Sequence, residues 1–179
     1  MKFDIKNRWM DEVTFTAEID CAEGASSSVK VGLSVKWAIK NKVYLREADL
    51  VGADLGRADL RGANLGEADL RGAKNTDLTF AQTSITPDGE LIGWKKLYGG
   101  VICKLRIPEN AKRSNATGRK CRAEFAIVLD GNGVSQYDNT FVYEVGNTVY
   151  PRTPFSDDRW DECAPGIHFF LTKVEAENY

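Results

Sequence analysis

The chain has 179 residues, of which 42% are hydrophobic and 28% are charged, as is usual for a globular protein of one domain or two small ones. The formal net charge of -2 argues against a general nucleic-acid-binding protein and against a polyanionic one. No apolar run approaches the ~18 residues that a membrane span requires, and residues 1–9 hold no apolar signal-peptide core, so we expect a cytosolic protein.

Residues 1–42 are predicted to form an N-terminal hairpin followed by a cap. Phe3 and Ile5 alternate with polar neighbours, as do the apolar residues from Val13 to Ile19, which predicts two strands with a turn within residues 7–12. Residues 29–42 also alternate, which would suit a strand. However, Ser26–Ser28 could cap a helix there, and the residues before Lys42 would close one well, so we expect a helix.

Residues 43–87 repeat with a period of five. A period of five collects its apolar residues on no single face of an α-helix or of a flat strand. A coil with sides of five residues would point them all inward, so the pattern predicts a solenoid. Leu fills six central positions, Ala precedes a central position by two residues, and Asp or Asn lies between: Leu45, Leu50, Leu55, Leu60, Leu65, Leu70; Ala48, Ala53, Ala58, Ala63, Ala68, Ala73; Asp49, Asp54, Asp59, Asn64, Asp69.

The repeat resembles the pentapeptide-repeat family through the segments YLREA, DLVGA, DLGRA, DLRGA, NLGEA and DLRGA. The resemblance implies a short right-handed quadrilateral β-helix, entered from a capping helix. The phase continues in weaker form to residue 87, with Asn75, Phe80 and Ile85 at central positions, so we expect just over two coils.

Residues twenty apart should stack in such a coil. Asp54 would then lie beside Lys74, and Arg57 beside Asp77, which are favourable pairs. The same spacing stacks two like-charged pairs, Asp49 with Asp69 and Glu47 with Glu67. The aspartates are tolerable there if their side chains bind the backbone at the corners of the coil.

Residues 88–179 are predicted to form a compact antiparallel β domain, so the whole chain is expected to be mainly β. Pro87–Gly89 is a turn and marks the boundary. Asp130–Gly133 is a strong turn signal, and Thr172–Glu175 fits a capping box for a short last helix. The candidate strands are residues 94–97, 101–107, 121–129, 140–145, 148–150 and 166–171.

The C-terminal half resembles a domain found behind pentapeptide repeats in phage and prophage proteins. The segments that carry the resemblance are KLRIPENAKRSNATGRKCRAEFA, FVYEVG and DRWDECAPGIHFFLT, and FDIKNRW and VTFTAEID resemble the N-terminal head of such proteins. The resemblance implies a phage-associated protein in the host bacterial cytosol. It supplies no site residues.

A basic stretch, residues 112–122, is the first candidate binding site. It contains Lys112, Arg113, Arg119, Lys120 and Arg122 and no acidic residue, with Ser114, Asn115, Thr117 and Gly118 between them. Cations beside hydroxyls and a glycine suit an anion or a phosphate, although the glycine spacing is not that of a P-loop. The alternative is a solvated loop between two strands.

A second candidate lies within residues 157–170, where Cys163 and the single histidine, His168, are close in sequence. They could form a nucleophile pair or, with Cys103 and Cys121, a zinc site. The cysteines lack the close spacing that is usual in zinc sites, so we expect free thiols, no metal, no cofactor and no catalysis. The alternative for His168 is a core or edge histidine with one hydrogen bond.

The repeat surface does not suit imitation of DNA, a role of some pentapeptide-repeat proteins. Between residues 43 and 87 seven acidic and five basic residues are mixed, whereas DNA repeats one charge per ~1.7 Å.

Three functional hypotheses follow from these observations. The first is a non-enzymatic phage-type accessory protein, in which the β-helix presents a C-terminal domain that binds a host protein, such as a defence protein that it inhibits. Residues 112–122 would form the surface, with Trp160 and His168 lining it. We expect no membrane partner and no sequence-specific nucleic acid, and exposed strand edges would suit a homodimer.

The second hypothesis is a sponge for an anionic, nucleotide-like small molecule. Its phosphates would pair with Arg113, Arg119, Lys120 and Arg122, and its base would stack on Tyr98, Tyr137 or Trp160. The third hypothesis is an enzyme that uses Cys163 and His168.

Overall fold

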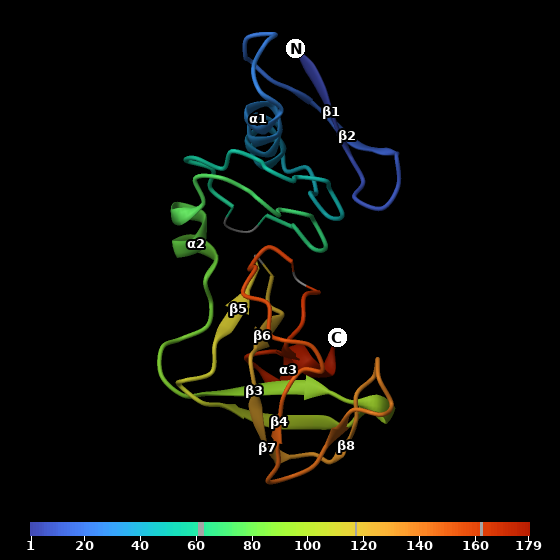
Figure 1. The fold of residues 1–179 in the computed structure, drawn as a ribbon. Coiled ribbons are helices and arrows are strands. Elements are labelled where there is room, and N and C mark those ends of the chain that lie inside the picture. Colours follow the sequence, from blue (N-terminus) through green and yellow to red (C-terminus); the bar gives the residue numbers. More distant parts are fainter. Residues whose placement is uncertain (61–62, 117, 162) are drawn as a thin grey trace. The chain divides into compact units, whose positions relative to one another are not determined.

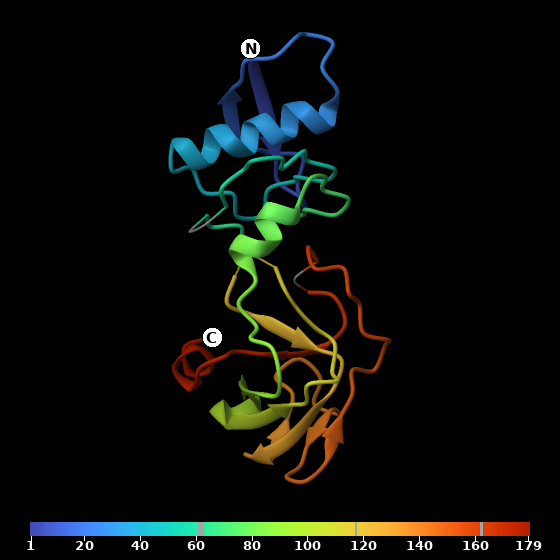
Figure 2. The ribbon, with the colours of Figure 1, turned by 90° about the vertical axis from the view of Figure 1, so that its left-hand side faces the viewer.

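The computed structural model of the chain describes residues 1–60, 63–116, 118–161 and 163–179 (Figures 1 and 2). The chain divides into two compact units. The first unit comprises Met1–Ser84, Ala116–Gly118 and Trp160–Cys163, and the second comprises Ile85–Asn115, Arg119–Arg159 and Ala164–Tyr179. Strands outnumber helices among the described residues, and none of the helices there is long and apolar enough to span a membrane.

The first unit begins with the predicted hairpin and helix, and both are confirmed. Strands β1 (Lys2–Lys6) and β2 (Val13–Glu18) pair antiparallel. Helix α1 (Ser27–Lys40) starts at Ser26, whose side chain accepts a hydrogen bond from the Val29 amide. The helix forms because its buried residues, Val31, Gly32, Ser34, Val35 and Ala38, fall on one face at helical spacing.

The repeat winds back beside itself every twenty residues. The Leu45 amide donates to the Asn64 carbonyl, and the Leu50 amide donates to the Asp69 carbonyl, both at 2.9 Å. Parallel bridges join Asp49 to Asp69 and Asp54 to Lys74, so these two predicted stacking pairs are confirmed. The six central Leu are all buried. α1 covers one end of this coil, where the Asp54 amide donates to the Ser28 carbonyl (Figure 2).

Each described corner of the coil is a β-turn with a left-handed residue. The second residue after a central Leu has a positive φ, and the Ala amide that follows donates to the Leu carbonyl, as from Ala58 to Leu55 at 2.9 Å. The side chain of Asp54 accepts the Gly56 amide at 3.0 Å, which fixes the corner. Ala and Leu therefore fill the interior, while Asp holds the turn. The described left-handed corner residues are Glu47, Gly52, Arg57, Glu67 and Gly72.

The like-charged stacks are neutralised at these corners, as expected for the aspartates. Asp69 accepts the Arg71 amide at 3.1 Å and pairs with the Arg71 guanidinium. The Arg46 guanidinium lies between Glu47 and Glu67, at 3.1 and 3.4 Å from their carboxylates.

The prediction that the repeat continues to residue 87 is wrong. Helix α2 (Asp77–Thr83) follows Lys74, and Phe80 lies on it with 39% of its surface exposed. Asn75 does not point inward either. It is exposed, and its amide donates to the Asp54 carboxylate at 2.7 Å. After Lys74 the Ala and Asp of the repeat are missing, and Asp77 instead favours the first turn of a helix.

The same helix overturns two other details of the sequence prediction. Asp77 starts α2 and does not continue the coil as a partner of Arg57. Ile85 belongs to the second unit, where it packs against that unit's apolar core.

The second unit is built from antiparallel sheets, as predicted. The largest has the strand order β10-β7-β4-β3, and a smaller one has the order β11-β6-β5. The element bounds are β3 (Leu91–Lys96), η1 (Tyr98–Gly100), β4 (Ile102–Ile107), β5 (Arg113–Asn115), β6 (Cys121–Ala123), β7 (Ala126–Asp130), β8 (Gly133–Val134), β9 (Val142–Tyr143), β10 (Thr148–Val149), β11 (Ile167–Phe169) and α3 (Lys173–Glu177).

Two details of this unit differ from the sequence prediction, and two agree. Residues 121–129 form two strands in two sheets, and part of the basic stretch is strand β5. The chain does turn at Asp130–Gly133, where it passes from β7 in one sheet to β8, which pairs with β9 in another. The capping box of α3 is confirmed, since Thr172 and Glu175 exchange side-chain to backbone hydrogen bonds.

Strand β11 joins the two larger sheets. It pairs with β6, and the residue after it, Phe170, exchanges two backbone hydrogen bonds with Trp94 of β3. Phe169 fills the space above Gly93, where an added Cβ would lie 2.5 Å from its ring. This close approach brings β3 beside β11 and so positions the residues described next.

Candidate functional site

The basic stretch contributes mostly to the framework of the second unit. Arg113 donates to the carbonyls of Pro87 and Pro108 at 2.8 and 3.0 Å. Arg119 forms an ion pair with Glu175 of α3. Lys112 is exposed, and Thr117 lies outside the described residues. The hydrogen bonds of the two arginines therefore go to the protein itself.

Arg122 is a buried guanidinium, with 1% of its surface exposed. It donates to the carbonyls of Ser156 and Asp158 at 3.0 and 2.6 Å, and to the Ser114 hydroxyl at 3.3 Å. These bonds hold residues 156–158 against β6. Arg122 therefore brings a fixed positive charge to the inside of the unit.

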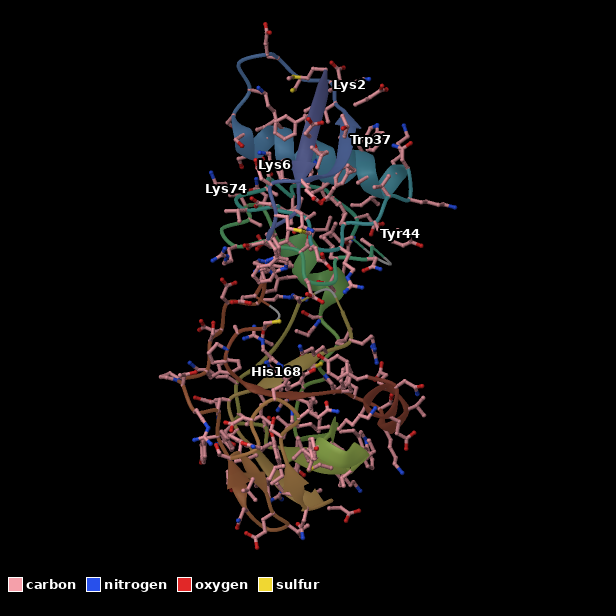
Figure 3. All side chains as sticks on the ribbon, turned by 90° about the vertical axis from the view of Figure 1, so that its right-hand side faces the viewer. Lys2, Lys6, Trp37, Tyr44, Lys74 and His168 are labelled. Atoms are coloured by element: carbon pink, nitrogen blue, oxygen red, sulfur yellow. The ribbon has the colours of Figure 1, made fainter. Side chains whose placement is uncertain are left out.

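His168, which is labelled in Figure 3, belongs to β11. In the pairing of β11 with β6 it lies directly across from Arg122. Its Nε2 is 3.0 Å from the Ala164 carbonyl, which can only accept, so this nitrogen carries the proton. Burial lowers the pKa of His168 to about 4, and the charges of Lys120, Lys95 and Arg122 act in the same direction. The imidazole is therefore neutral near pH 7.

Lys95 of β3 reaches the backbone of His168. Its ammonium donates to the His168 carbonyl at 3.3 Å and lies 5.8 Å from the centre of the Tyr143 ring. Burial, followed by the charge of Lys120, lowers the pKa of Lys95 to about 8. Among the described residues no carboxylate forms an ion pair with Lys95.

Lys120 completes a group that we call the Lys95 cluster: Lys95, Lys120, Arg122 and His168. The Lys120 ammonium lies 5.5 Å from the centre of the Tyr179 ring, and no described carboxylate pairs with it. Strands β3, β6 and β11 and the loop before β6 thus bring three cations near one neutral imidazole. Such an arrangement can bind an anion.

The sequence pointed to three members of this cluster and missed the fourth. Lys120, Arg122 and His168 were candidates, but Lys95 was not. The signal for Lys95 is its place in the alternation of β3. Side chains two residues apart on a strand point to the same face, and Leu91 and Gly93, which share the face of Lys95, are buried. A lysine at a core-facing position is uncommon and therefore informative.

The remaining sequence candidates lie elsewhere. Trp160 packs in the first unit's core, edge-to-face with Phe80 at 5.4 Å, and 7% of its surface is exposed. Tyr98 and Tyr137 are exposed.

All four cysteines are free, which agrees with the predicted thiols. Burial raises the pKa values of Cys103 and Cys121 to about 12, so both thiols stay protonated. Cys163 is exposed and belongs to the first unit, whereas His168 belongs to the second. No three potential ligands gather around a metal site in the described part of the chain, so the four residues considered for zinc do not form one. Glu162, which also belongs to the candidate segment 157–170, lies outside the described residues.

Two family comparisons match the chain. Residues 81–176 match a family of unknown function (DUF5758), and residues 41–74 match eight copies of the pentapeptide repeat. No curated protein and no solved structure matches the chain.

Proposed function

The chain belongs to the family of unknown function DUF5758 and carries pentapeptide repeats in front of that domain. From this premise we propose that it is a non-enzymatic binding protein. Its second unit would hold an anionic group at the Lys95 cluster. The first unit would serve as its platform.

The unpaired state of Lys95 is the observation that supports this proposal. Its ammonium is partly buried, has one hydrogen bond to a carbonyl, and lies near a second ammonium, that of Lys120. An ammonium withdrawn from water without an opposite charge lowers stability. An anion placed between Lys95 and Lys120 would supply that charge through short charge-assisted hydrogen bonds.

We further propose that the repeat is a short right-handed quadrilateral β-helix. The bonds between residues about twenty apart, the inward Leu and the turns at five-residue intervals all support four sides of five residues. Its ends cannot bury themselves, which agrees with α1 covering the end at Asp54.

Thermal unfolding of the full chain with and without inorganic phosphate tests the anion site. We expect millimolar phosphate to raise the melting temperature of the wild type, because a ligand that binds only the folded state stabilises it. Lys95→Met should abolish the rise. Lys104→Met is the matched control. Lys104 belongs to the neighbouring strand β4, and its ammonium lies over the Trp94 ring, so its replacement should leave the rise in melting temperature intact. An equal rise in the Lys95 variant would refute the site.

A protein partner is the second candidate function, and the hairpin turn favours it. Trp9 and Met10 are exposed there, Trp9 to 66%, beside a hollow of about 270 Å³ lined by Asn7, Glu12, Val13, Thr14, Arg46 and Glu47. Exposed apolar residues of this kind suit a protein contact. In this proposal the chain is a phage-type accessory protein that inhibits a defence protein in the host cytosol.

Affinity capture from bacterial lysate tests the second candidate. We expect Trp9→Ser to lose a host protein that the wild type retains. Tyr137→Ser removes a similarly exposed aromatic from the second unit and should retain it. Identical captured proteins for the wild type and both variants would count against a partner at the hairpin turn.

A further inference from the structure

The Lys95 amine has surroundings that make it a nucleophile. A lysine is activated when it is withdrawn from water or placed next to another cationic group. The Lys95 ammonium donates to the His168 carbonyl at 3.3 Å, no described carboxylate pairs with it, and burial and the charge of Lys120 both lower its pKa. With its pKa at about 8, about a fifth of its amines are neutral at pH 7.4, against on the order of one in a thousand for an ordinary lysine. The residue as a whole is half-buried.

The other ionisable groups around Lys95 do not compete with it. Cys103, directly across in β4, holds its proton because burial raises its pKa to about 12. Burial likewise raises the pKa of the Tyr143 phenol. His168 is neutral, with its Nε2 hydrogen directed to a carbonyl, and the Arg122 guanidinium donates to the Ser156 carbonyl. Cys103 and Tyr143 therefore supply no thiolate or phenolate that would compete with the Lys95 amine.

We propose that Lys95 captures small aldehydes or ketones that carry a carboxylate or phosphate, as a reversible imine. The amine nitrogen attacks the carbonyl carbon and forms the C–N bond, and the nitrogen gives up two protons as the carbonyl oxygen leaves as water. No oxidant or reductant is needed. Lys120 holds the anionic group during this step, so the inference rests on the proposed anion site.

Two features of the site favour such an adduct. The ligand's anion supplies the opposite charge that Lys95 and Lys120 lack. The imine is less basic than the amine it replaces, so the product removes a poorly solvated positive charge from the interior. An uncharged aldehyde offers only the second of these gains, and the anion should therefore decide selectivity.

Borohydride trapping tests the proposal on the full chain. The protein is incubated with glyoxylate, reduced, and examined by intact mass spectrometry and peptide mapping. We expect one carboxymethyl adduct per chain, at Lys95, formed at least ~10-fold faster than at any other lysine, with a rate that rises from pH 6.5 to 8. Lys95→Arg keeps the charge and should form no adduct, whereas Lys104→Arg should behave as wild type.

Acetaldehyde and inorganic phosphate separate this inference from the proposed function. Acetaldehyde should label Lys95 at least ~10-fold less than glyoxylate, and phosphate should slow labelling by glyoxylate. If phosphate stabilises the protein but labelling spreads over the exposed lysines, Lys95 capture is overturned and the anion site stands. If both aldehydes label Lys95 equally and phosphate neither stabilises nor protects, both proposals are overturned.

Discussion

Burial disfavours the protonated, charged form of His168, and this makes the stability of the folded chain depend on pH. The pKa of His168 is about 4 in the folded chain and about 6.5 when unfolded, so between these values the unfolded chain binds the proton and the folded chain does not. This residue's contribution to stability is therefore complete above pH 6.5 and is lost as the pH falls toward 4, by up to about 3 kcal/mol.

Urea unfolding of the wild type and of His168→Gln at pH 7.5 and 4.5 measures this effect. Gln keeps a donor for the Ala164 carbonyl but does not titrate, so the variant should lose less stability on acidification. Carboxylates titrate in both proteins and cancel in the comparison. Equal losses would show that His168 is not the group responsible.

The corners of the coil set the stability of the repeat at the scale of an element. Arg57 occupies a left-handed corner with φ 62°, a conformation that costs a side chain roughly 1 kcal/mol relative to glycine. Arg57→Gly should therefore raise the free energy of unfolding by about 1 kcal/mol, measured by urea denaturation. Glu67→Gly should gain less because Glu67 also pairs with Arg46. A loss of stability in Arg57→Gly would show that its side chain matters more than its backbone strain.

Helix α1 depends on one close approach to the coil. A Cβ on Gly32 would lie 2.0 Å from the Asp54 carbonyl oxygen, so Gly32→Ala should destabilise the first unit by ~3 kcal/mol or more. Helix propensity alone predicts the opposite sign, a gain of about 1 kcal/mol. Gly24→Ala, where an added Cβ meets nothing within 4 Å, is the control. Calorimetry of both variants decides, and a stabilised Gly32→Ala would exclude this packing.

Local elements could be predicted from sequence where one physical rule dominates. The Leu period fixed the coil, and Ser26 favoured a helix although residues 29–39 alternate like a strand. Helix α2 was missed because Asn75 and Phe80 keep the numerical phase without the Ala and Asp that make a corner. The Lys95 cluster was only partly predictable, since a bond such as Lys95 to the His168 carbonyl joins residues 73 apart.

Homodimerisation stays a prediction at the scale of the whole molecule, and the outer edge of strand β2 is where we expect two copies to pair. Met1 and Ile19 exchange backbone hydrogen bonds, so by alternation along the hairpin the backbone groups of Thr16 and Glu18 point away from β1. No described residue bonds to them. An open edge without proline or lysine is a template for a second strand, and we expect two copies of β2 to pair.

Light scattering of the full chain measures that pairing. Thr16→Pro removes the outward amide together with the side-chain bond to Asp4, and it should reduce the measured mass from that of a dimer to that of a monomer, because proline is tolerated on an edge where its nitrogen faces solvent. Thr16→Val also loses the bond to Asp4 but keeps the amide, so it should stay dimeric. Equal masses for the two variants would place any dimer contact elsewhere.

The twenty-residue return of the coil also constrains how the gene can change in length. A one-residue deletion between Leu45 and Leu70 would turn every later Leu out of the interior, whereas inserting twenty residues would add one layer of ~4.8 Å and leave the following helix in the same orientation. Inserting five residues would instead add one side of the coil, so that the helix would start a quarter of a turn further round. Inherited variants of this repeat should therefore differ by whole layers.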